Sequence, residues 1–309
     1  MTKIKQLNNH VMKKLLSIGI VLLSIATLSA QTITVEKSYR LMDQQGFHPQ
    51  FNTTGSMLAF TTESYTGLDV YNFSNNAVVK VSEDPGAGFQ PVFSKSSDKV
   101  FFKNILYENR LRKEGIKSYE FNNNKKTTML EPRRVIKQPQ AFENGILVYA
   151  DARLLKATFG KTKTPVTDYV WSDGNNLNIY RDNKIQRLNP VGDANGYIWA
   201  SLSPNGKMIL FTAAGTGTFV SDLNGKIIAR LGYLNAPVWY NDNMVVGMQD
   251  KDNGEYVTES KILMKSIDGK VEKVLSTPNQ IAMYPTAASA AKKVAYNTVK
   301  GEIYVVELK

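Results

Sequence analysis

The sequence predicts an all-β fold, a six-bladed β-propeller whose N-terminal strand closes the last blade. Three observations support this prediction. A phrase made of a short strand, a tight turn and an apolar strand occurs six times along the 309-residue chain. Further strand-like segments follow each copy, and four strands in a unit of roughly 40–50 residues are typical of a propeller blade. The last unit ends one strand short, while a strand-like segment without a unit of its own precedes the first.

The clearest copy of the phrase covers residues 199–211. It places Ser203-Pro204-Asn205-Gly206 between two short apolar stretches. Proline at the second position and glycine at the fourth suit a type I turn, which reverses the chain between strands. The opening residues of the six copies, which precede the proline position, are His48, Gln90, Gln138, Trp199, Ala236 and Tyr284.

The later strands of each unit also follow a pattern. A third strand has an apolar-aromatic signature, as in Leu68–Tyr71 and Leu177–Tyr180, and a fourth ends in one aliphatic residue. The sixth unit stops at Lys309 without a fourth strand, whereas Lys37–Leu41 has the fourth-strand form and no unit before it. Pairing these two ends closes the ring and leaves no unpaired edge at the seam, which favours a propeller over a β-sandwich.

The third unit leaves the number of blades open because it is longer than the others. Residues 153–166 read as an insertion, and Tyr169–Gly174 reads as a second possible hairpin. We expect six blades, with seven as the alternative. The pattern does not decide whether residues 151–168 form a binding loop or a disordered insertion.

The repeat resembles that of TolB-type propellers, whose phrase runs proline, aromatic, Ser-Pro-Asp-Gly, an apolar strand ending in Phe, then Ile-Tyr. Residues 48–71 and 199–211 match it best, and the resemblance extends over about residues 33–309. The second and sixth copies depart from it at the turn. TolB has a separate α/β domain ahead of its propeller, for which residues 31–47 are too short, so the resemblance implies the propeller alone. A fold by itself does not assign a function.

The N-terminus is predicted to be a secretory signal peptide. Two lysines precede an apolar run over residues 15–28, and small residues stand before a cleavage position after Ala30. This is the arrangement of a signal peptide, and the run is too short to cross a hydrocarbon core of ~30 Å comfortably. We therefore expect a signal peptide at residues 1–30 and a propeller at residues 31–309. The mature protein is expected to be periplasmic or secreted, with no membrane span after cleavage.

The positive charge is concentrated in one segment. The formal net charge of +11 falls to about +7 without the four lysines of residues 1–30, and Lys95–Lys137 holds 12 basic and 5 acidic residues. An acidic envelope protein or an anionic glycan is the expected partner of such a patch, rather than nucleic acid, which an exported protein rarely meets. A solvated surface with no partner is the alternative. The densest basic residues are Arg110, Arg112, Lys113, Arg133 and Arg134.

No motif in the sequence predicts catalysis. The chain has no cysteine, and His48 is the only histidine after residue 30. A Ser-His-Asp triad would have to use this histidine, and there is no Gly-x-Ser-x-Gly motif. We therefore expect no catalytic residue, no metal and no cofactor. Asp151 and Asp168 leave one alternative, a carbohydrate-binding or carbohydrate-cleaving propeller with aromatic platforms and a carboxylate pair.

The favoured function is an exported, non-catalytic scaffold that binds a protein or peptide partner in the bacterial envelope. The innermost strand of each blade lines the central channel, so the opening residues of the phrase are expected to ring one mouth of it. Residues 103–116, 151–168 and 249–259 are expected to extend this surface. The binding residues predicted at the mouth are His48, Gln90, Gln138, Trp199 and Tyr284.

Overall fold

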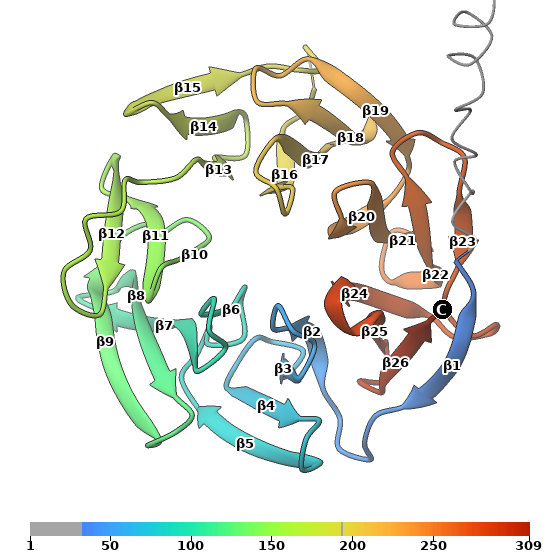
Figure 1. Ribbon diagram of the computed structural model, residues 1–309, viewed down its shortest axis with the longest axis horizontal. Helices are drawn as coiled ribbons and strands as arrows, with labels where there is room; N and C mark the ends of the chain where they lie inside the picture. The colour runs from blue at the N-terminus through green and yellow to red at the C-terminus, as the bar shows by residue number, and fades with distance from the viewer. Residues whose placement is uncertain (1–32, 193) are drawn as a thin grey trace, which may run out of the picture. The chain divides into compact units, whose positions relative to one another are not determined.

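The computed structural model describes residues 33–192 and 194–309. In the unit Thr34–Lys309, strands β1 to β26 form seven antiparallel sheets that follow one another around a ring (Figure 1). The all-β propeller prediction is therefore confirmed. The predicted signal peptide lies outside the described residues. Among the residues that the structure does describe, no helix is long and apolar enough to cross a membrane.

Each sheet is one blade, and the blades are numbered here along the chain. Blade 1 contains β2 (Phe47–Phe51), β3 (Met57–Thr61), β4 (Leu68–Asn72) and β5 (Ala77–Ser82); blade 2 contains β6 (Val92–Phe93), β7 (Lys99–Glu108), β8 (Leu111–Glu120) and β9 (Lys125–Arg133). Blade 3 contains β10 (Gln140–Phe142), β11 (Gly145–Ala150) and β12 (Arg153–Thr158); blade 4 contains β13 (Tyr169–Ser172), β14 (Leu177–Arg181) and β15 (Lys184–Leu188). Blade 5 contains β16 (Tyr197–Leu202), β17 (Met208–Ala213), β18 (Gly217–Asp222) and β19 (Ile227–Gly232). Blade 6 contains β20 (Asn235–Asn241), β21 (Met244–Asp252), β22 (Val257–Ser266) and β23 (Glu272–Val274); blade 7 contains β24 (Ala282–Ala288), β25 (Lys293–Thr298), β26 (Ile303–Leu308) and β1 (Val35–Arg40).

The described chain has seven blades, so the predicted number of six is wrong. The third predicted unit contains two sheets, because the stretch read as an insertion supplies β12 and Tyr169–Gly174 begins a new sheet at β13. A two-residue turn at Asp151 and Ala152 joins β11 to β12, with φ of 50° and 58° as hairpin turns require. Blades 3 and 4 have three strands each. Together they therefore fit the length that the sequence assigns to one extended unit.

The N-terminal strand closes the ring, as predicted. β1 pairs with β26 in antiparallel register, with Tyr39 opposite Val305. The backbone N–H of Leu41 continues the ladder by donating to the carbonyl of Ile303 at 2.8 Å. The seam therefore has the same backbone hydrogen bonding as the inside of a blade, and the last sheet has four strands (Figure 1).

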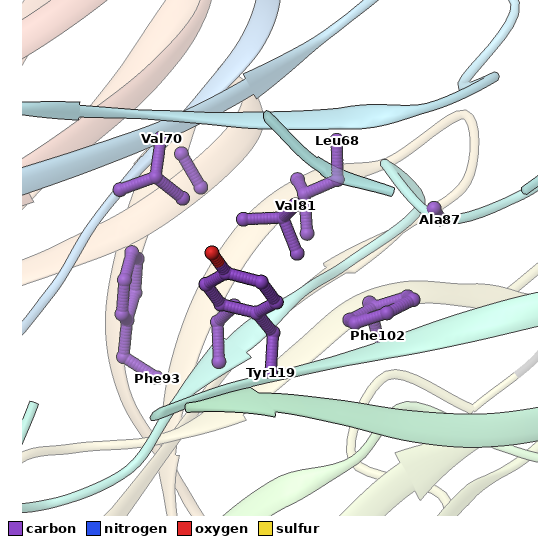
Figure 2. Packing of buried hydrophobic residues seen from close by; sticks show 9 residues of the cluster. Leu68, Val70, Val81, Ala87, Phe93, Phe102 and Tyr119 are labelled. Carbon is purple, nitrogen blue, oxygen red and sulfur yellow. The ribbon is translucent and has the colours of Figure 1, made fainter. Parts of the chain in front are cut away.

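The hydrophobic core lies between neighbouring blades rather than at the centre of the ring. Figure 2 shows the interface of blades 1 and 2, where Val70 and Val81 pack with Phe102 and Tyr119. All four are at most 5% exposed. Burying one such side chain contributes about 1.5–3 kcal/mol. Because these clusters lie between the sheets, the inner strands are free to present side chains to the central channel.

Candidate functional site

The inner strands of four blades contain a β-bulge at the opening residue of the repeated phrase. The register of β2, β16, β20 and β24 against their second strands shifts around His48, Trp199, Ala236 and Tyr284. These residues, and Gln90 just before β6, have a left-handed backbone with φ between 43° and 55°. This conformation costs a non-glycine residue about 1–2 kcal/mol. Bulges re-aim side chains and are frequent beside binding sites, so a strained residue that recurs in the same place marks a candidate site.

All six opening residues line one cavity of about 360 Å³. They come from the start of the inner strand in blades 1, 2, 3, 5, 6 and 7, so the cavity is the mouth of the central channel. Gln138 is exposed, and the other five are partly buried. The structure therefore brings together the five predicted binding residues, and Ala236 with them.

An aromatic cluster covers one sector of this mouth. The imidazole of His48 stacks on the ring of Tyr65, with 4.0 Å between ring centroids, and lies 4.3 Å from the ring of Tyr284. Phe89 meets Tyr65 edge to face at 5.2 Å. Sequence reasoning missed Tyr65 and Phe89. They lie in the β3–β4 turn and in the connection to β6, which antiparallel pairing places at the same end of the blade as the start of an inner strand.

The aromatic sector is uncharged at neutral pH, with carboxylates beside it. Burial lowers the pKa of His48 to about 4, which a hydrogen bond with the Glu63 backbone only partly opposes. Burial raises the pKa of Tyr65 to about 12, and it also raises the pKa of Tyr284, to which the negative charges of Asp250 and Glu63 add. The mouth therefore presents neutral rings in a locally negative field.

Three of the five residues predicted for the basic patch form ion pairs in the structure. The densest part of the patch lies on the long hairpin β7–β8, where Arg112 pairs with Glu114 and Lys113 pairs with Glu108. Arg133 pairs with Asp151 at the β11–β12 turn. Of the five predicted residues, Arg110 and Arg134 are exposed without an ion pair in the described part of the chain. Glu114 lies two residues from Arg112 on β8, whereas Glu108 lies across the β7–β8 hairpin from Lys113.

A buried ion pair lies behind the mouth. Lys103 is 5% exposed and Glu114 is 7% exposed. The Nζ of Lys103 donates to Oε2 of Glu114 at 3.0 Å and to the carbonyl of Ile136 at 2.9 Å. It also lies 5.2 Å from the ring centre of Phe89. This pair therefore ties the hairpin β7–β8 to the next connection and to the aromatic sector.

The carboxylates that suggested other chemistry have separate roles. Asp151 pairs with Arg133, whereas Asp168 lies beside β13, where burial raises its pKa and Arg181 opposes that effect. In residues 33–192 and 194–309, no three or more histidine, aspartate or glutamate side chains gather where they could hold a metal ion.

Comparison with known proteins supports the fold. No protein-family model and no curated protein matches the sequence. The chain is similar in structure to TolB from Acinetobacter baumannii, with 14% identity and a TM-score of 0.52, over 78% of this chain and 56% of that one. The present chain thus spans little more than half of the TolB chain that it matches.

Two isolated propeller domains are similar over more of the chain. The β-propeller domain of Cps50 (Swd1) from Myceliophteria thermophila has 10% identity and a TM-score of 0.58, over 90% of this chain and all of that one. The β-propeller domain of the Trilobed protease from Pyrococcus furiosus, described as having an open velcro topology, has 12% identity and a TM-score of 0.57. That match covers 89% of this chain and 96% of that domain. At these identities the likeness shows the fold alone, and it confirms the predicted resemblance to a TolB-like β-propeller.

Proposed function

We propose that this chain is an exported, non-catalytic propeller scaffold that binds a peptide segment of an envelope protein at the mouth of its channel. The observation that supports this most directly is the cavity of about 360 Å³ formed by the six opening residues of the repeat. A concave site with rigid aromatic rings and a few polar groups is the usual form of a ligand pocket. Its size suits a few side chains of an extended segment better than a whole folded surface.

The side chains of the mouth support a peptide as the ligand. Aromatic residues lose little conformational entropy on binding and are frequent anchors at interfaces. Gln90 and Gln138 add amide groups that can donate to and accept from a peptide backbone. Two long hairpins, β7–β8 and β21–β22, end at the same end of the ring as the mouth, with Tyr107 72% exposed and Tyr256 62% exposed near their tips. These tips offer contacts to residues beyond the bound segment.

The proposal of a non-catalytic role rests on the chemistry of the mouth. Its one histidine is partly buried among rings, with a pKa of about 4, and the carboxylate of Asp151 is paired with Arg133. The proposal of export rests on the N-terminal sequence. Mass spectrometry of the protein recovered from its host tests it, because cleavage after Ala30 leaves Gln31 as the first residue. A mature protein that retains residues 1–30 contradicts export by this route.

Site-specific photo-cross-linking in living cells tests binding at the mouth. A Gln138→p-benzoylphenylalanine variant places the probe in the cavity, and Glu131→p-benzoylphenylalanine places it at an exposed position on the outermost strand of blade 2 as the control. We expect a discrete protein adduct from position 138 that is absent from position 131. Loss of this adduct on Trp199→Ala would place the partner in the cavity. Equal adducts at both positions, or none at position 138, would contradict the proposal, and a glycan-sized mass at position 138 would favour the carbohydrate alternative.

A further inference from the structure

A smaller cavity of about 180 Å³ opens beside the channel mouth. It shares His48, Tyr65 and Tyr284 with the channel cavity and adds Phe47, Glu63 and Asn297. The two cavities therefore lie side by side and share the same three rings, so a segment bound at the mouth has the side pocket next to it.

The side pocket has an aromatic wall and one charge. Glu63 supplies the one carboxylate among the side chains that line it, and burial keeps His48 neutral at neutral pH. Glu63 is exposed, and within the described residues it belongs to none of the ion pairs. The carboxylate of Asp250 is close enough to Tyr284 to raise its pKa as well. The pocket is therefore negative, and it has no basic group to offset Glu63.

The wall of the pocket is held in place before any ligand arrives. His48, Tyr65 and Tyr284 all have left-handed backbones, with φ of 52°, 61° and 51°. The side chain of Asn297, 1% exposed, accepts a hydrogen bond from the backbone N–H of His48 at 3.0 Å. Strained residues that are held by buried partners are typical of preorganised sites.

We propose that this side pocket receives a basic side chain, lysine or arginine, of the peptide segment bound at the channel mouth. The proposal rests on the proposed function and adds the specificity of the same site. A cation over aromatic faces is attracted by the ring quadrupole, and a carboxylate at the rim adds a charge-assisted hydrogen bond. An acidic side chain would be repelled by Glu63, and an apolar one would gain only the contact with the rings.

Nuclear magnetic resonance of the ring of His48 tests this inference without a known partner. The chain has two histidines, so the imidazole signal of His48 is resolved and reports directly on the wall of the pocket. The probes are the acetylated amides of arginine, lysine, norleucine and glutamate. We expect arginine and lysine amides to shift this signal saturably, with affinity about tenfold higher than that of norleucine amide. The glutamate amide is expected to have no effect.

Matched variants show whether the carboxylate is responsible. Glu63→Gln should reduce the affinity for arginine amide to that of norleucine amide, whereas Glu36→Gln, at an exposed glutamate on β1, should leave it unchanged. Equal melting temperatures of the variants would show that both fold. The inference is overturned if norleucine amide binds as well as arginine amide, or if Glu63→Gln does not change the preference. Such a result leaves the cross-linking at position 138 to decide the proposed function separately.

Discussion

Replacing Lys103 by methionine is expected to destabilise the propeller by about 3–4 kcal/mol, mainly because it leaves the carboxylate of Glu114 buried with one partner fewer. Removing one member of a buried pair usually costs 3–5 kcal/mol, and the remaining contact of Glu114 with Arg112 places the value at the lower end. The carbonyl of Ile136 also loses its donor, at about 1 kcal/mol. Replacing both members by apolar residues removes the uncompensated charge.

A double-mutant cycle measures this coupling. Urea unfolding of the Lys103→Met, Glu114→Leu and double variants, followed by intrinsic fluorescence, gives the free energies of unfolding. We expect the double variant to be at least about 2 kcal/mol more stable than the sum of the single effects predicts. Additive effects would refute the reasoning, since they would mean that the two charges stabilise the fold independently.

Three further outcomes follow from the structure. The variant Ser38→Cys/Val306→Cys should form a disulfide across the seam, because the ladder places these residues opposite each other at a non-hydrogen-bonded pair. The disulfide should raise the free energy of unfolding by about 2–4 kcal/mol, and reduction with dithiothreitol should reverse the gain. No gain on oxidation would contradict the register. Folding lowers the pKa of His48 from 6.5 to about 4, so its contribution to the free energy of unfolding is complete above pH 6.5 and is lost as the pH falls toward 4. This loss is about 1–2 kcal/mol at pH 5 after allowance for partial exposure, and it should be absent from a His48→Gln variant in parallel urea titrations. Finally, Phe102→Ala should lower the free energy of unfolding by about 3–5 kcal/mol, measured by urea or thermal unfolding, because Phe102 is fully buried between blades 1 and 2. A loss below about 1 kcal/mol would contradict that packing.

The mouth of the channel was largely predictable because it depends on a local pattern. The opening residue of each phrase occupies the same place in its blade, so the repeat alone places six side chains around one axis. The residues that give the mouth its chemistry were not predictable in this way. Tyr65, Phe89 and Glu63 lie in turns and connections whose sequences differ from blade to blade. Glu63 and Tyr65 come from the β3–β4 turn of the blade that carries His48, and Phe89 comes from the connection to blade 2. Antiparallel pairing brings both segments to the end of the ring where β2 begins.

The all-β class, the strand repeat and the closure of the last blade by β1 could be predicted from the sequence, because they depend on alternation, turn residues and the order of strands along the chain. The number of blades depends on tertiary contacts. A segment such as Arg153–Thr158 becomes an insertion or a strand according to the partner that accepts its backbone hydrogen bonds. The same holds for the charge of residues 95–137. Composition records a surplus of cations, but only the structure shows which of them are paired. Glu108 lies across the hairpin from Lys113, Glu114 lies beside Arg112 on β8, and Asp151 pairs with Arg133.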